Sequence, residues 1–71
     1  MRKAPPITNR VRALREAHGS MSQQALADAI NVTRQTIIAI EQGKYSPSLE
    51  SAFRIARVFS VGVEDVFGWE G

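Results

Sequence analysis

Residues 22–43 constrain the fold more strongly than any other part of this chain of 71 residues. They contain two short apolar patterns with helical spacing, preceded by Ser22 and Thr33, which are residue types that cap helix N-termini. Asn31 and Gly43 follow the two patterns, and both residue types tolerate the left-handed backbone that ends many helices. We therefore expect one helix that ends at Asn31 and a second that ends at Gly43.

Spacing also assigns the buried face of each helix. The first buries Leu26, Ala27 and Ile30, and the second buries Ile37 and Ile40. Because only about three residues join the helices, they must cross steeply, and the small Ala27 suits a close crossing. The stretch therefore predicts a helix-turn-helix pair over residues 22–43.

The opposite face of the second helix carries polar side chains near its start. Arg34, Gln35 and Ile38 point away from the buried stripe, and Gln23 lies beside them at the start of the first helix. Arg and Gln carry paired hydrogen-bonding groups that match guanine and adenine edges in the major groove of DNA. Since helical hairpins occur in many folds, a structural hairpin with a solvated polar face is the alternative interpretation.

Three further helices are predicted around this pair: residue 8 or 9 to residue 18, residues 48–59 and residues 63–67. Residues 1–7 are expected to form an extended N-terminal arm, with a short β-pairing of Ile7 with Trp69 as a possibility. The chain is too short for a second domain. We expect a single all-α domain of five helices over residues 1–71.

The fourth predicted helix carries the largest apolar face, with Leu49 and Phe53 among its members. The apolar side chains near the C-terminal end exceed the needs of one small bundle, so part of them is expected to face a second subunit; the alternative is that they belong to the core. The candidates for this dimer surface are Ile55, Val58, Val61, Val63, Val66 and Trp69.

Composition excludes several classes of function. There is no cysteine, one histidine and no Gly-rich phosphate loop, so we expect neither an enzyme nor a metal or cofactor site. The longest apolar runs are a few residues, which argues against a membrane span. The N-terminus lacks the apolar stretch of a signal peptide, so a cytoplasmic protein is expected.

Charge is distributed unevenly along the chain. Residues 1–62 carry nine basic and four acidic residues, a net charge of +5, whereas residues 63–71 carry three acidic residues and no basic one. A basic body of this kind suits a surface that faces phosphates, although ordinary scatter of surface charge is the alternative.

Four segments, SQQALA, VTRQTI, IEQGKYSPSLE and VEDVF, resemble the Cro/C1-type (XRE) helix-turn-helix family of repressors, in particular the short stand-alone members related to the cytolysin repressor. The resemblance covers residues 8–67. It implies a five-helix domain that binds double-stranded operator DNA as a homodimer, with the third helix in the major groove.

The resemblance also implies roles for individual residues. Arg15 and Glu41 match a structural ion pair that links the first helix to the end of the third. Positions that face bases are Gln23, Arg34, Gln35 and Ile38, and positions near the DNA backbone are Thr33, Thr36, Lys44, Tyr45, Arg10 and Arg12. Lys44 and Tyr45 have loop surface as their alternative role.

Two departures from the family pattern affect the expected site. Asn31 stands where the family usually has glycine, which strains the turn slightly, and Ile38 replaces a small polar residue, so it can contact a thymine methyl group but cannot donate a hydrogen bond. We predict a transcriptional repressor that binds a pseudo-palindromic operator and takes no small-molecule ligand. The alternative function is a protein-interaction module of the same fold that holds a partner such as a toxin.

Overall fold

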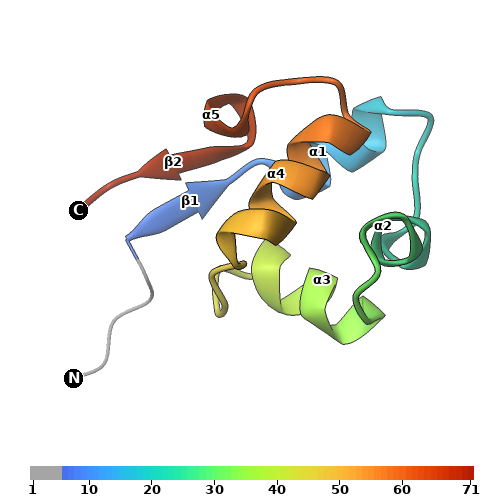
Figure 1. Cartoon of the computed structure of the whole chain (residues 1–71), viewed down its shortest axis with the longest axis horizontal. Helices are drawn as coiled ribbons and strands as arrows, with labels where there is room; N and C mark the ends of the chain where they lie inside the picture. The colour runs from blue at the N-terminus through green and yellow to red at the C-terminus, as the bar shows by residue number, and fades with distance from the viewer. Residues whose placement is uncertain (1–5) are drawn as a thin grey trace.

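The computed structural model describes residues 6–71, which form five α-helices and two short β-strands (Figure 1). The elements in chain order are β1 (Ile7–Asn9), α1 (Val11–Ala17), α2 (Gln23–Ile30), α3 (Arg34–Glu41), α4 (Leu49–Val58), α5 (Val63–Val66) and β2 (Phe67–Trp69). The predicted five-helix fold is confirmed. Residues 1–5 of the predicted arm lie outside the described residues.

The three central helices begin where the sequence predicted. Ser22, Thr33 and Ser48 each accept a hydrogen bond through the side-chain oxygen from the backbone N–H three residues further on, at 2.9, 3.2 and 3.1 Å. These bonds satisfy N–H groups that have no partner within the helix. Asn31 ends α2 in the left-handed conformation with a φ of 61°, and Gly43 follows α3 with a φ of 73°.

A single apolar core joins the helices. α2 packs against α3 and α4, α1 packs against α3, and α4 packs against α5. Ala27 is fully buried, as a close crossing of α2 and α3 requires. The core consists of Val11, Leu26, Ala27, Ile30, Ile37, Ile40, Ile55, Ala56, Phe59 and Val66.

The two strands lie side by side at one end of the molecule, next to α5, whereas α2 lies at the opposite end (Figure 1). They are antiparallel, with Ile7 opposite Trp69, so the predicted pairing of these residues is confirmed. Asn9 connects this two-stranded sheet to the helices, because its Nδ2 donates to the carbonyl oxygen of Ile40 at 2.8 Å and its Oδ1 accepts from the backbone N–H of Val11 at 3.1 Å. The end of α3 is thereby attached to β1.

Two predicted helix boundaries were wrong. The first helix begins at Val11 rather than at residue 8 or 9, because Thr8 and Asn9 belong to β1 and Asn9 supplies the oxygen that caps the helix start. The last helix ends at Val66, and Phe67 begins β2. In both cases the strand pairing takes residues that the sequence analysis assigned to the end of a helix.

The predicted dimer surface is wrong for Ile55 and Val66. Both side chains are buried in the core of the single chain and present no surface to a partner. Val58, Val61 and Val63 are partly buried against the same core. Trp69 is the one candidate of the six that is largely exposed.

Candidate nucleic-acid interface

The two faces of α3 differ in burial and chemistry. Ile37 and Ile40 are buried against α2 and the rest of the core, which holds the helix from behind. Arg34 and Gln35, in the first turn, are exposed, and Ile38 is partly buried. The structure therefore brings the predicted base-facing residues of α3 to one accessible surface.

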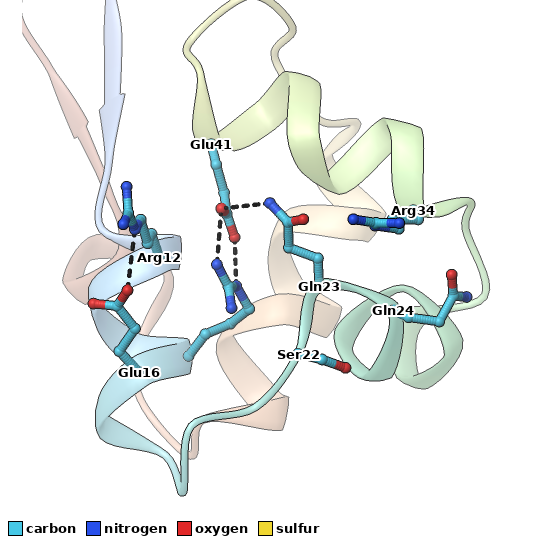
Figure 2. A pocket seen from close by; sticks show the side chains of 8 residues that line it. Arg12, Glu16, Ser22, Gln23, Gln24, Arg34 and Glu41 are labelled. Carbon is cyan, nitrogen blue, oxygen red and sulfur yellow. Dashed lines mark hydrogen bonds and ion pairs between the residues drawn. The ribbon is translucent and has the colours of Figure 1, made fainter.

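A polar cleft of about 460 Å³ lies beside this surface, between α1, the start of α2 and α3 (Figure 2). It gathers charged and amide side chains from three consecutive helices. Its lining residues are Arg12, Arg15, Glu16, Ser22, Gln23, Gln24, Arg34 and Glu41.

An ion pair between Arg15 and Glu41 forms one wall of the cleft. Arg15 Nε donates to Glu41 Oε2 at 2.6 Å, and Arg15 Nη2 donates to Glu41 Oε1 at 3.0 Å. The guanidinium also donates through Nη1 to the carbonyl oxygen of Met21 at 2.7 Å. The two side chains are only 11% and 7% exposed. The predicted link between α1 and the end of α3 is present as a bidentate, largely buried pair.

The surroundings of this pair favour its charged form. Burial raises the pKa of the Glu41 carboxyl, but the hydrogen bonds from Arg15 and Gln23 outweigh burial, so the pKa lies below its usual value. The hydrogen bond to Glu41 raises the pKa of Arg15, against the effect of burial. Glu41 is therefore a carboxylate at neutral pH and can only accept hydrogen bonds.

Gln23 is attached to this ion pair. Its Nε2 donates to Glu41 Oε1 at 3.1 Å, and its amide oxygen lies on the side that faces Arg34 (Figure 2). Sequence analysis assigned Gln23 to the base-facing residues but missed its contact with Glu41. One observation could have indicated this contact: the resemblance already placed Gln23 at the DNA-facing start of α2 and Glu41 at the end of α3.

The predicted backbone-contact residues lie at both ends of α3. The hydroxyl groups of Thr33 and Thr36 are 3.1 Å apart, and Thr33 also caps the helix. Lys44 and Tyr45 follow α3 and are exposed. Hydroxyl groups therefore lie at the start of α3, and an ammonium and a phenol group follow shortly after its end.

Arg10 and Arg12 have partners within the domain. Arg10 Nη2 donates to the carbonyl oxygen of Asp65 at 2.9 Å, which connects the start of α1 to α5. Arg12 pairs with Glu16 at 3.0 Å, and the two side chains are 75% and 59% exposed. Because exposed pairs of this kind contribute little, Arg12 can exchange Glu16 for another anion at low cost.

A second exposed surface was not predicted. Leu49 and Phe53, both on α4, are 72% and 53% exposed; the sequence analysis assigned them to the apolar face of this helix but did not name them as candidates for the dimer surface. Leu49 also borders an apolar groove of about 290 Å³, whose other lining residues are Ile7, Pro47, Ala52, Val63 and Phe67. We call Leu49, Phe53 and this groove the α4 apolar surface.

Residues 6–71 contain neither a metal-binding cluster nor a membrane-spanning helix. No group of three or more Asp, Glu or His side chains there could hold a metal ion. No helix of that region is long and apolar enough to cross a membrane.

Similarity to known proteins identifies the family of this chain. The chain is 50% identical over 64 residues to an uncharacterized HTH-type transcriptional regulator from Methanocaldococcus jannaschii, a match that covers 90% of this chain and 96% of that protein. It is 48% identical over 64 residues to the uncharacterized HTH-type transcriptional regulator YgzD of Bacillus subtilis, with the same coverage of both chains.

A crystal structure of a protein from Bacteroides fragilis has the same fold, with a TM-score of 0.75 at 21% identity, over 87% of this chain and 98% of that one. Residues 11–66 also match a family described as helix-turn-helix. Its α2 and α3 are capped and packed together, and its relatives are about 50% identical over 90% of its length; the chain belongs to the Cro/C1-type (XRE) helix-turn-helix family.

Proposed function

We propose that this protein is a sequence-specific DNA-binding transcriptional regulator that acts as a repressor, with α3 in the major groove. The observation that carries the proposal is the exposed first turn of α3, where Arg34 and Gln35 stand free of the core while Ile37 and Ile40 anchor the helix. Arginine pairs with guanine and glutamine with adenine through two hydrogen bonds each. The names of the relatives, HTH-type transcriptional regulators, support the same function.

Each side chain has a distinct role in this proposal. Arg34, Gln35 and Ile38 read bases, with Gln23 beside them. Thr33, Thr36, Lys44 and Tyr45 contact the phosphate backbone, and Arg10 and Arg12 add positive charge. Backbone contacts set the register of the protein on the duplex, whereas base contacts set its sequence preference.

A homodimer is part of the proposal. One α3 reads only a few base pairs, and a two-fold dimer would place two such helices about 34 Å apart on one face of the duplex. We assign the dimer contact to the α4 apolar surface and Trp69, because exposed apolar patches of this kind mark interaction sites. Occupation of promoter DNA in the cytoplasm would then repress transcription without a bound ligand.

Selection from a pool of randomised duplexes tests this function directly. The expected result is a two-fold-symmetric consensus whose affinity falls steeply with salt, since each neutralised phosphate contributes about −0.9 to the slope of log K against log salt. Arg34→Ala and Gln35→Ala should each cost about 1–3 kcal/mol on the consensus and relax one base preference.

Lys44→Ala is the matched control, because it should weaken binding to consensus and random duplexes alike. Equal loss on both duplexes for Arg34→Ala would remove its base-reading role. A pool with no enriched duplex would favour the alternative function, a protein-interaction module that uses the α4 apolar surface to hold a different protein.

A further inference from the structure

The cleft beside α3 contains a chain of polar contacts that begins at a buried charge. Arg15 holds Glu41 through two hydrogen bonds, and Glu41 in turn accepts from Gln23 Nε2. The Gln23 amide oxygen then faces the guanidinium of Arg34 (Figure 2). The hydrogen bonds therefore link the structural ion pair to Gln23, whose free amide oxygen lies on the side of Arg34, the first residue of the proposed recognition helix.

Glu41 determines which end of the Gln23 amide points outward. A carboxylate has only acceptors, so the reversed amide would place two acceptor oxygens against each other. The depressed pKa of Glu41 and its 7% side-chain exposure keep this acceptor charged and shielded from water at neutral pH. The Gln23 amide therefore points its nitrogen toward Glu41 and its oxygen, Oε1, away from Glu41.

Arg34 is a donor from which this oxygen can accept a hydrogen bond. Its side chain is exposed and makes no ion pair with any residue of the described region, 6–71. A guanidinium has five N–H donors, and a guanine edge uses two of them. The guanidinium of Arg34 can therefore donate to a base through one edge and still have N–H groups left to donate to Gln23 Oε1.

We propose that Glu41 is a positioning residue for base reading: it fixes the Gln23 amide so that Gln23 Oε1 accepts a hydrogen bond from Arg34 on DNA. This proposal rests on the proposed function. Gln23 then acts through Arg34 and does not read a base of its own. Specificity at one base pair depends on a carboxylate that never touches DNA.

The neighbouring Gln24 provides a matched control. It is the same residue type on the same cleft, but its Nε2 donates to Asp28 Oδ1 at 2.9 Å and is not part of the chain to Glu41. Gln23→Leu removes the acceptor and leaves the Arg15–Glu41 pair intact. Glu41→Gln keeps the shape of the side chain but lets the Gln23 amide take both orientations.

The experiment measures a discrimination ratio. The first probe is the duplex that the wild-type protein enriches from a random pool. The second is the same duplex with one base pair changed, at the position where the Arg34→Ala variant no longer prefers any base. The ratio is the affinity for the first duplex divided by the affinity for the second. Gln23→Leu should lower this ratio about threefold to tenfold, the value of one hydrogen bond. Glu41→Gln should lower it less, and Gln24→Leu should leave it unchanged.

Two further results decide the proposal. In the Arg34→Ala background, Gln23→Leu should have no additional effect on the ratio. A Gln23→Leu protein that binds every duplex more weakly but keeps the ratio would overturn the proposal, and so would a full effect in the Arg34→Ala background. Failure of the proposed function is a separate outcome, since the wild-type protein would then enrich no duplex at all.

A measurement on the wild-type protein covers the case in which Glu41→Gln does not fold. In NMR spectra, the Gln23 side-chain amide hydrogens should show cross-peaks to the Glu41 side chain. Cross-peaks from these hydrogens to the Arg34 side chain instead would show the reversed amide and refute the role of Glu41.

Discussion

Replacing Arg15 with methionine should destabilise the domain far more than any exposed substitution. The change removes two hydrogen bonds to Glu41 and one to the carbonyl oxygen of Met21, and leaves a carboxylate that is 7% exposed with Gln23 as its remaining donor. Removing one partner of a buried ion pair costs about 3–5 kcal/mol. A domain of this size has a total free energy of unfolding of roughly 4–11 kcal/mol.

The expected loss is therefore about a quarter or more of the stability. Urea unfolding followed by circular dichroism should show it, and the melting temperature should fall by roughly 12 °C or more, at about 4–8 °C per kcal/mol. Arg12→Met is the matched control, one turn earlier on α1. Because the Arg12–Glu16 pair is exposed, this control should change the free energy of unfolding by less than about 1 kcal/mol.

The double variant Arg15→Met/Glu41→Leu tests whether the lost stability comes from leaving the Glu41 carboxylate unpaired or from losing the bonds of the ion pair themselves. If the cost comes from an unpaired buried charge, apolar side chains at both positions should restore most of the lost stability. The reasoning fails if Arg15→Met costs less than about 1 kcal/mol, or if the double variant loses the sum of the two single losses.

Three other predictions follow from the described contacts. Because the Glu41 pKa is lowered in the folded state, the unfolded chain binds more protons in acid, so stability should fall as pH drops below about 4.5, and less so in Glu41→Gln when urea midpoints are compared. Asn31→Gly should raise the free energy of unfolding by up to about 1 kcal/mol, whereas Asn31→Ala should lower it, since the φ of 61° suits glycine. Leu49→Glu combined with Phe53→Glu should give a monomer in sedimentation experiments with the melting temperature of the single domain preserved; a dimer that persists would exclude the α4 apolar surface as the contact.

Features that depend on neighbouring residues were predictable from the sequence. Capping by Ser22 and Thr33 depends on the backbone three residues away, and the left-handed Asn31 depends on its own side chain. The buried Ile37 and Ile40 followed from helical spacing alone. The helix-turn-helix pair was accordingly predicted with its boundaries correct to within a residue or two.

Features that depend on how distant elements meet were not predictable to the same degree. Spacing gives the direction of an apolar face but not its width. Leu49 and Ile55 were both assigned to the apolar face of the fourth helix, with Ile55 as a dimer candidate, whereas in the structure Ile55 is buried in the core and Leu49 is exposed. The bond between Gln23 and Glu41 joins residues 18 positions apart and depends on the angle between α2 and α3. The resemblance supplied the Arg15–Glu41 pair and placed Gln23 at the start of α2, but it did not give the hydrogen bond between Gln23 and Glu41.

The helices are all short, and this has a consequence for how small a working unit can be. α3 has 8 residues and α4, the longest helix of the described region, has 10. Isolated helices below about 12–15 residues are marginal in water. A synthetic peptide of α3, or of α2 and α3 together, should therefore be unstructured, and amide hydrogens throughout the helices should exchange through one common opening of the whole domain.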